Sequence, residues 1–419
     1  MDTLPVVEKV SADVLTEARL RIWTVRVVVV VLTLIATFAG LELLLDRYYS
    51  AGQSQQMSRF DPVLGWTNVP GDYWNKPLRE LHKTSIHINQ LGFRTAGEER
   101  PAPAGSSVVV LGDSFVVARD SEYSESFPAR LERLLNAHMS GGVEVLNAGV
   151  PGYGTGQELL LVRQLYERQK IKPNVFLLMF FTNDTLDNLC LSYGDLKFQP
   201  IRPCFTLDDD GKPVLTRLPE NIPDYADDAI VATFQAPSAS TTISIARDWT
   251  EEWIQTKPNL IKLFEMLGIS PRVPRMPGLL NAWYPNRVVE KGVPLTAALI
   301  AQLASEIREH GGRLIVSMIP SPFQIYPETY VPLLQNSFPG DVNVDRFQSD
   351  IFRPQRMVRD MCLKAGVPFQ DLEPILAHHR DTPLFTPRDG HLNHVGHKLV
   401  GEVLEPFVLE NMPKDAIHP

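Results

Sequence analysis

The sequence predicts a mixed α/β domain built on a parallel sheet and preceded by one long apolar helix. Short runs of apolar, β-branched residues alternate with segments in which apolar residues recur at helical spacing. Such alternation is typical of parallel strands joined by right-handed crossovers, with helices on both faces of the sheet. Near the N-terminus, a further apolar run is long enough to cross a membrane.

Five runs predict the strands of the sheet. They lie at residues 107–114, 143–149, 174–181, 313–320 and 367–372. Helical spacing predicts helices at residues 126–139, 157–169, 295–309, 354–365 and 394–410. This order predicts a flavodoxin-like, doubly wound parallel sheet of about five strands with helices on both faces, plus one N-terminal transmembrane helix.

Length and charge limit the classes of function. The chain has 419 residues, enough to bury a substantial core, and 44% of them are hydrophobic. The formal net charge is -9, and no block of basic residues occurs. Because phosphate binding needs a surface rich in lysine and arginine, we expect no nucleic-acid partner.

The predicted transmembrane helix covers residues 27–45, nineteen positions that contain one charge, Glu42. At 1.5 Å per residue it spans about 28 Å, close to the hydrocarbon thickness of a bilayer. A signal peptide has a shorter apolar core and a small-residue cleavage site, so we expect an uncleaved helix. The alternative is a buried core helix, which five consecutive valines disfavour because they are poor helix formers in water.

Charges around this helix predict its orientation. Arg19, Arg21 and Arg26 precede it, and only Arg47 follows closely. Because cytoplasmic flanks carry the excess of lysine and arginine, residues 1–26 are expected to form a cytoplasmic tail. The chain after about residue 46 is then expected outside the cytoplasm.

The part after the helix is expected to contain an extension and one domain. Residues 46–105 are polar and irregular apart from a strand predicted at 82–89, and we interpret them as an extension and connector. The α/β domain is expected to cover residues 106–410. Residues 185–292 fit its alternation poorly, and they are either a substrate-facing cap or a surface insertion without a role in the site.

The three cysteines do not have the spacing of a structural zinc site. Cys190 and Cys204 lie close together in one proline-containing segment. Outside the cytoplasm a disulfide between them is plausible, and the alternative is a pair of free thiols. Cys362 is expected to be a buried small hydrophobic residue.

Polar residues follow the predicted strands where ligands bind in an open parallel sheet. Three such groups are 112–114 (Gly-Asp-Ser), 147–149 (Asn-Ala-Gly) and 182–184 (Thr-Asn-Asp). A fourth, at 389–393, precedes the last predicted helix. These groups are far apart in the sequence, but a doubly wound fold is expected to bring them together.

Together these groups supply the residue types that acyl transfer needs. Ser114 can be the nucleophile, with His391 as the general base and Asp389 as the carboxylate that orients the imidazole. The tetrahedral oxyanion needs preorganised N–H donors. The backbone N–H groups of Ser114 and Gly149 and the side-chain amide of Asn183 can provide them.

These blocks resemble the GDSL/SGNH hydrolase superfamily. The matching segments are GDSF (112–115), NAGVPGYGT (147–155), FTND (181–184) and DGHLNHVGH (389–397). INQLGFR (88–94) is similar to a membrane-anchored bacterial branch of that superfamily. The resemblance covers roughly 88–185 and 310–405. It implies the roles given above for Ser114, Gly149, Asn183 and His391, and a single-pass protein of the cell inner membrane with a periplasmic catalytic domain.

The sequence departs from the family pattern at two positions. The third block usually has glycine two residues before its asparagine, and here Phe181 occupies that position. The last block commonly has aspartate three residues before its histidine, where this chain has Arg388. Asp389, two residues before the histidine, is the available carboxylate.

Some of these residues also have ordinary structural interpretations. Asn147 and Asn183 can be turn residues, and a Gly-Asp turn after a strand is common. Asp184 and Asp187 are expected to be loop charges. The ordered set of four blocks at strand ends favours a serine site over these separate interpretations.

Three histidines near the end of the chain allow a further alternative. His391, His394 and His397 are spaced so that they could form a surface patch or bind a metal. His394 is also a competing general base. We prefer His391 because Asn393 and Gly396 follow it at the offsets usual in the family.

The expected activity is that of a serine esterase or O-acyltransferase acting on a cell-envelope ester, with carbohydrate O-acetyl groups as the expected substrate. No cofactor or metal is expected. A transferase needs a membrane partner that supplies the acyl donor, because a single span cannot carry one across a bilayer. One alternative is a catalytically quiet glycan-binding or scaffold protein, which Phe181 favours. Another is a lipase-like enzyme with an apolar cleft in the cap.

Overall fold

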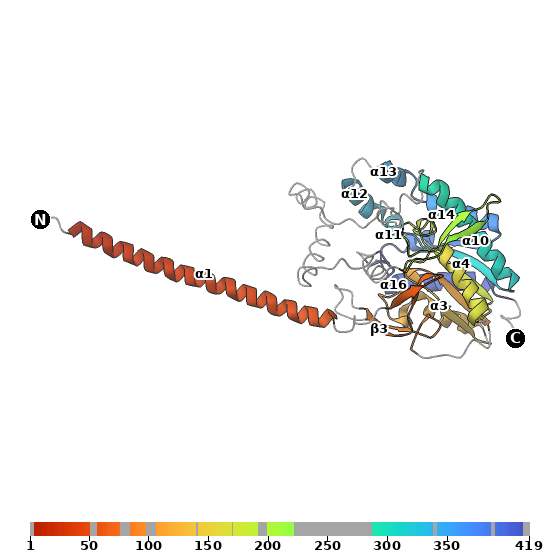
Figure 1. Ribbon diagram of the computed structural model, residues 1–419, viewed down its shortest axis with the longest axis horizontal. Coiled ribbons are helices and arrows are strands. Elements are labelled where there is room, and N and C mark those ends of the chain that lie inside the picture. The colour runs from red at the N-terminus through yellow and green to blue at the C-terminus, as the bar shows by residue number, and fades with distance from the viewer. Residues whose placement is uncertain are drawn as a thin grey trace.

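The computed structural model describes most of the chain. The described residues are 4–50, 57–75, 84–97, 106–139, 141–169, 171–191, 199–221, 287–337, 342–386 and 390–413. Figure 1 shows a long N-terminal helix that projects from an α/β domain in which helices surround a central sheet.

The parallel sheet forms as predicted. Its five parallel strands are β6 (Ser106–Gly112), β7 (Val143–Asn147), β8 (Val175–Phe180), β11 (Arg313–Met318) and β12 (Phe369–Asp371). Their spatial order is β12-β11-β8-β6-β7, so the first strand lies between the second and the third. This is the flavodoxin-like order, and the chain has the predicted fold.

The extension before the domain continues the same sheet. It adds three antiparallel strands at the β7 edge: β5 (Arg94–Thr95), β4 (Thr84–Ile88) and β3 (Gly71–Asn75). β4 matches the predicted strand at 82–89. The extension also contains a hairpin of β1 (Ser58–Asp61) and β2 (Gly65–Asn68). These other strands were not predicted, because they are short and mostly polar.

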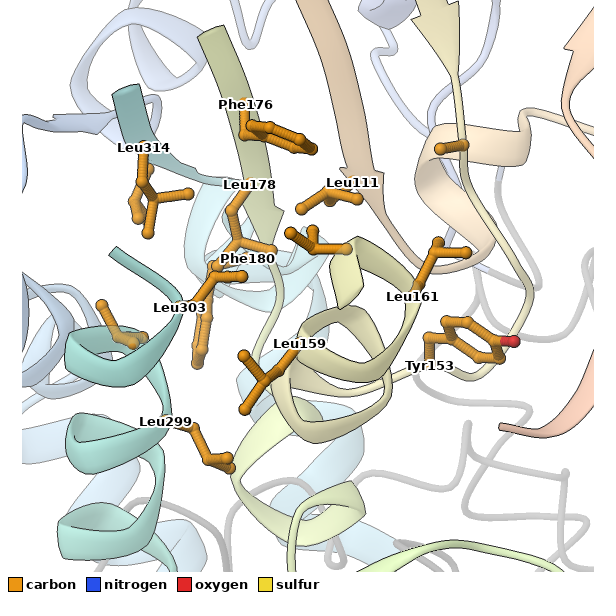
Figure 2. Packing of buried hydrophobic residues seen from close by; sticks show 14 of the residues in the cluster. Leu111, Tyr153, Leu159, Leu161, Phe176, Leu178, Phe180, Leu299, Leu303 and Leu314 are labelled. Carbon is orange, nitrogen blue, oxygen red and sulfur yellow. The ribbon is translucent and has the colours of Figure 1, made fainter. Parts of the chain in front are cut away.

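The predicted helices form and cover both faces of the sheet. They are α3 (Phe127–His138), α4 (Thr155–Gln164), α10 (Arg287–Glu309), α14 (Arg353–Ala365) and α16 (His394–Asn411). A π-helical turn, η2 (Leu165–Gln169), continues α4. Val109 and Leu111 of β6 belong to one core cluster with residues of α4, α10 and α14, and Figure 2 shows Leu111 on the same side of the sheet as residues of α4 and α10. Val108 and Val110 pack with α3 and α16 on the opposite face, because successive side chains of a strand alternate.

Several short helices were not predicted. They are α2 (Ser114–Val117), η1 (Tyr123–Glu125), α5 (Asp184–Asp187), α11 (Pro322–Ile325), α12 (Pro327–Ser337), α13 (Val342–Ser349) and α15 (Glu373–His378). Most are too short to show a helical period in the sequence. Prolines at the starts of α11 and α12 make these segments resemble loops in the sequence.

The N-terminal helix α1 (Leu4–Ser50) extends beyond the predicted span at both ends. Its apolar part, Arg21–Leu45, has a mean hydropathy of 2.5 and is not buried against the domain. The side chains of Leu43 and Leu44 are 72% and 70% exposed. The helix is long and apolar enough to cross a membrane, either as an anchor or as a signal sequence.

The first part of the insertion at 185–292 packs against the domain. It contains a hairpin of β9 (Cys204–Leu207) and β10 (Pro213–Arg217), and residues 192–198 and 222–286 lie outside the described part. Ile201 and Phe205 are buried in the same core cluster as α4 and α10. A disulfide joins Cys190 to Cys204, whereas Cys362 is a buried free thiol, as predicted.

The disulfide is expected to stabilise the domain. Replacing both Cys190 and Cys204 with serine should lower the free energy of unfolding by about 3 kcal/mol, because the bond closes a loop of about 15 residues. Thermal unfolding of the detergent-solubilised full chain, with and without reductant, measures this effect. The double variant should not respond to reductant. Complete reduction should raise the number of free thiols of the wild type from one to three. If the melting temperature then stays the same, the prediction is wrong.

Candidate active site

Ser114 lies at the carboxyl end of the first parallel strand. β6 ends at Gly112, and Ser114 begins the short helix α2. The Asp113 carboxylate caps this helix by accepting the Phe115 N–H at 3.0 Å. Gly112 has φ +150°, and a Cβ there would lie 2.5 Å from Val116 Cγ2. The sharp turn that presents Ser114 therefore requires glycine at position 112.

His391, near the C-terminal end of the domain sequence, contacts Ser114. The distance from His391 Nε2 to Ser114 Oγ is 2.7 Å, although 277 positions separate the two residues in the sequence. The Phe115 ring packs at 4.9 Å from the imidazole. The Thr386 N–H donates to the His391 carbonyl oxygen at 2.7 Å, which fixes the backbone beside the imidazole. The hydroxyl and the imidazole are therefore within direct proton-transfer distance.

The other histidines of the last block have different surroundings. His394 is exposed at the start of α16, whereas His397 is buried and stacks on Phe127 at 5.8 Å. Burial, together with the charges of Arg94 and His391, lowers the pKa of His397 to about 3, so this imidazole is neutral at physiological pH. Within the described ranges, no group of three or more His, Cys, Asp or Glu side chains could hold a metal ion.

Asp389, the predicted partner of His391, lies outside the described residues. The residues that follow it cap α16. Asn393 accepts the N–H groups of Val395 and Gly396 at 2.9 and 3.0 Å. A Cβ at Gly396 would collide with the Leu384 carbonyl oxygen, so glycine lets the start of this helix approach the preceding loop.

The second block packs directly against the serine helix. A Cβ at Gly149 would lie 2.7 Å from both Val116 Cβ and Val117 N, so only glycine fits there. The Asn147 amide donates to the Val116 carbonyl oxygen at 2.7 Å, and Asn147 Oδ1 accepts the Gly149 N–H at 3.2 Å. Asn147 therefore connects this block to α2 in addition to turning the chain.

The third block places Asn183 beside Asp113. Asn183 Nδ2 donates to Asp187 Oδ2 at 2.7 Å. A hydrogen bond from Asn183 also opposes the rise in the pKa of Asp113 that burial causes. Phe181, which replaces the usual glycine, packs at 4.4 Å from the Phe115 ring. The aromatic pair Phe115 and Phe181 therefore lies next to His391.

Four carboxyl groups are buried around this site. Asp113, Glu158, Asp184 and Asp187 are each at most 4% exposed. The expectation that Asp184 and Asp187 are loop charges is wrong, because both belong to the buried helix α5. Burial raises the pKa of all four groups, and mutual repulsion raises the pKa of Glu158 and Asp184 further. For Asp187, burial raises the pKa to about 7 although Arg202 opposes the shift.

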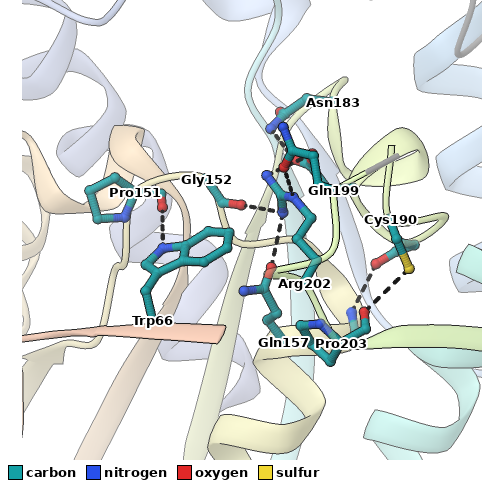
Figure 3. A network of polar contacts seen from close by, with 12 residues as sticks. Trp66, Pro151, Gly152, Gln157, Asn183, Cys190, Gln199, Arg202 and Pro203 are labelled. Atoms are coloured by element: carbon teal, nitrogen blue, oxygen red, sulfur yellow. Dashed lines mark hydrogen bonds and ion pairs between the residues drawn. The ribbon is translucent and has the colours of Figure 1, made fainter. Parts of the chain in front are cut away.

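Arg202 supplies a positive charge to this cluster from the insertion. Its Nη2 atom lies 3.0 Å from Asp187 Oδ1, and the two side chains are 7% and 1% exposed. Figure 3 shows its further contacts with the Gly152 carbonyl and the Gln157 side chain. No motif in the sequence identified Arg202 or Asp187, because their pairing depends on how the insertion folds back.

Arg94 stabilises the segment that follows the serine helix. Its side chain is fully buried and donates to the carbonyl oxygens of Val117, Ala118, Ser85 and Ser121. Burial lowers its pKa to about 10. The segment INQLGFR (88–94), noted in the sequence, therefore contributes a structural support for Ser114 that its motif alone did not reveal.

Comparison with known proteins identifies the family. The chain matches the GDSL-like Lipase/Acylhydrolase family over residues 110–399. No curated protein sequence matches it significantly. Similar solved structures include TesA, with 12% identity, a TM-score of 0.37, and coverage of 73% of this chain and 100% of that one. A lipase/acylhydrolase from Enterococcus faecalis has 15% identity and a TM-score of 0.35, with 74% and 97% covered.

The acetyl xylan esterase AlAXEase has 12% identity and a TM-score of 0.32, with 72% of this chain and 99% of that chain covered. The family match includes the serine turn, the second and third blocks and the final histidine block, and it extends over more than half of the chain. The protein therefore belongs to the GDSL-like lipase/acylhydrolase family and is an ester hydrolase of the SGNH type.

Proposed function

We propose that this protein is a serine-dependent esterase or O-acyltransferase that forms an acyl-enzyme on Ser114. The observation that carries the proposal is the 2.7 Å contact between Ser114 Oγ and His391 Nε2. A serine hydroxyl is a poor nucleophile until a neighbouring base takes its proton in the transition state. His391 is in position to do so, and Asp389 is its proposed carboxylate partner.

In the first half of the reaction, Ser114 Oγ attacks the ester carbonyl carbon while its proton passes to His391 Nε2. The carbonyl electron pair moves onto oxygen, forming a tetrahedral intermediate. Collapse of this intermediate expels the alcohol, which takes the proton from His391 and leaves an acyl–Ser114 ester. Water then attacks the acyl-enzyme with His391 again as the base, and the released acid leaves Ser114 reprotonated by His391.

We propose three donors for the oxyanion: the backbone N–H groups of Ser114 and Gly149 and the Asn183 amide. The Gly149 N–H makes only a long contact of 3.2 Å with Asn147 Oδ1, which an oxyanion can replace. One N–H of Asn183 is held by Asp187, and the other donates to Asp113 beside Ser114; we propose that this second N–H turns to the oxyanion when it forms. Preorganised donors of this kind each contribute about 3–4 kcal/mol to transition-state stabilisation.

The proposed substrate is a small ester of the cell envelope, with carbohydrate O-acetyl groups as the first choice. The Phe115 ring lies 4.9 Å from the imidazole of His391 and packs on Phe181, and we propose that this pair restricts the room for a long acyl chain. Hydrolase and transferase share the acyl-enzyme and differ in whether water or a sugar hydroxyl attacks it. A transferase reaction requires a membrane partner that delivers the acyl group to this side of the bilayer.

The proposed location is the inner membrane, with the catalytic domain in the periplasm. The exposed apolar helix Arg21–Leu45 supports a single membrane span. Arginines at positions 19, 21 and 26 support a cytoplasmic N-terminus. The Cys190–Cys204 disulfide fits a domain in an oxidising compartment. In this arrangement the insertion at 185–292 is proposed as a cap over the site.

Ser114→Ala and His391→Ala should each lower kcat for 4-nitrophenyl acetate by about 1000-fold or more, because each removes a group that acts in the chemical step. A fluorophosphonate probe should label the wild type and not Ser114→Ala. His394→Ala is the matched control, since this exposed histidine lies three residues away and should retain activity. Absence of labelling in both wild type and Ser114→Ala would instead support a catalytically quiet glycan-binding or scaffold protein.

Acetyl esters should be better substrates than long-chain esters. We expect kcat/KM to fall at least about tenfold between acetyl and octanoyl esters, because extra methylenes must displace the Phe115–Phe181 pair. Phe181→Ala should reduce this difference. Acetate release from acetylated envelope polysaccharides tests the natural class of substrate. A preference of the wild type for long chains would contradict the acetyl assignment and favour a lipase-like enzyme.

The proposed orientation predicts an exported C-terminus. A reporter enzyme that is active only outside the cytoplasm should be active when fused after residue 413. The same reporter fused after residue 26, before the proposed span, should be inactive and serves as the control. Activity of a cytoplasm-only reporter at the C-terminal position would show that the orientation is wrong.

A further inference from the structure

We propose that Arg202 is a positioning residue for the oxyanion donor Asn183 and acts on it through Asp187. This inference rests on the proposed function, because it concerns the alignment of a donor in that reaction. It assigns a role in the site to a residue of the insertion, which lies outside the four sequence blocks that resemble the family. The three side chains come from the third block, from helix α5 and from the loop closed by the disulfide.

The contacts form a continuous chain from the insertion to the serine turn. Arg202 Nη2 lies 3.0 Å from Asp187 Oδ1, and the other oxygen, Oδ2, accepts the Asn183 amide at 2.7 Å. Asn183 in turn interacts with Asp113, which precedes Ser114. An amide has two N–H groups that point about 120° apart. Holding one of them on Asp187 leaves the other for Asp113 beside Ser114, from which an oxyanion formed at Ser114 can take it over.

Arg202 itself is held in one position by several contacts. Its Nε donates to Gln199 Oε1 at 2.7 Å, and Nη1 donates to the Gly152 carbonyl oxygen at 2.7 Å and to Gln157 Oε1 at 3.0 Å. The guanidinium carbon lies 4.9 Å from the centre of the Trp66 ring, whose indole N–H donates to Pro151. Because the guanidinium is fixed on every side, it can fix Asp187 in turn.

The charge of Arg202 decides the ionisation of Asp187. Asp187 is 3% exposed, and the acidic groups that face it are Asp113 after β6, Glu158 on α4 and Asp184 on its own helix. Burial and the charge of Asp113 raise the pKa of Asp187, and Arg202 and Asn183 oppose them. Without Arg202, Asp187 becomes protonated at a higher pH. A neutral carboxyl group is a weaker acceptor, and it no longer holds the Asn183 amide in a single orientation.

Close packing around Asp187 fixes the segments that bring Arg202, Asp187 and Asn183 together. A Cβ at Gly154 would lie 2.9 Å from Asp187 Cβ, so glycine lets α5 approach the start of α4. The Gly156 N–H donates to Asn188 Oδ1 at 2.9 Å, which joins the same two elements. The Cys190–Cys204 bond closes the loop that carries Arg202. These contacts bring the insertion and the third block together at Asp187.

Arg202→Gln should lower kcat for 4-nitrophenyl acetate by about 10- to 100-fold, part of the loss seen when an oxyanion donor is removed. KM should change by less than about threefold, because the donor acts mainly on the transition state. Rates are normalised to sites labelled by the fluorophosphonate, which removes any effect of unfolded protein. Arg163→Gln is the control, since it breaks a more exposed arginine–carboxylate pair, with Glu306, that connects α4 to α10 and includes none of the proposed site residues, and it should leave kcat unchanged.

The pH profile separates positioning from a general structural role. The deficit of Arg202→Gln should be largest just above pH 7, where Asp187 is ionised in the wild type and still protonated in the variant. It should shrink below pH 7, where Asp187 is neutral in both proteins, and again at higher pH, where Asp187 ionises without its cation. Arg202→Lys should recover part of kcat, since it keeps the charge. Asp187→Asn should give a deficit that grows as pH rises through about 7 and then stays constant, because asparagine cannot ionise, and adding Arg202→Gln to it should cause little further loss.

Two results would overturn the inference, and they are distinguishable. If Ser114→Ala is as active as the wild type, the proposed function fails and the inference fails with it. If Ser114→Ala is inactive but Arg202→Gln matches Arg163→Gln at every pH, the serine site stands and only the role of Arg202 is wrong. A loss that is equal at all pH values and additive with Asp187→Asn would also reject the pathway through Asp187.

Discussion

The contact between Ser114 and His391 depends on close backbone packing at the carboxyl end of the sheet. Glycines at positions 112, 149 and 396 stand where a Cβ would collide with α2 or with the loop before α16. They let three separate segments approach within the distance that a side-chain hydrogen bond requires. The 2.7 Å contact therefore depends on these three glycines, which lie in segments far apart in the sequence, as well as on the two side chains that form it.

Four buried carboxyl groups lie around the site at the same end of the sheet, although burying charged groups is energetically unfavourable. Burying a carboxylate costs several kcal/mol unless it is paired, and of the four buried carboxyl groups only Asp187 has an ion pair with Arg202 among the described contacts. Raised pKa values let Glu158 and Asp184 stay neutral, while Asp187 is stabilised in its charged form by Arg202 and Asn183. Buried ionisable groups with shifted pKa values, which lower the stability of the fold, are common at functional sites that orient polar groups away from water.

The sequence predicted the sheet, its helices and the meeting of Ser114 with His391, because each depends on signals that a single chain displays. Apolar periodicity is local, and parallel topology places the ends of strands together. Other features depended on tertiary structure. Asp184 and Asp187 resemble loop charges in the sequence and become buried only when α5 packs against α10 and the start of α4. The short strands β3 and β5 have too few apolar residues to indicate pairing before β7 is in place.

The insertion is the clearest case in which sequence spacing and physical role diverge. A segment that interrupts the strand–helix alternation looks optional, since the parallel sheet is complete without it. Yet Ile201 and Phe205 lie in the main core, and the cation paired with Asp187 comes from Arg202 between them. A buried carboxylate whose counter-charge comes from an insertion connects that insertion to the site, because removing the cation raises the pKa of the carboxyl group and favours its neutral form. Substitutions in this segment are therefore expected to disturb the geometry of the third block more than that of the parallel sheet.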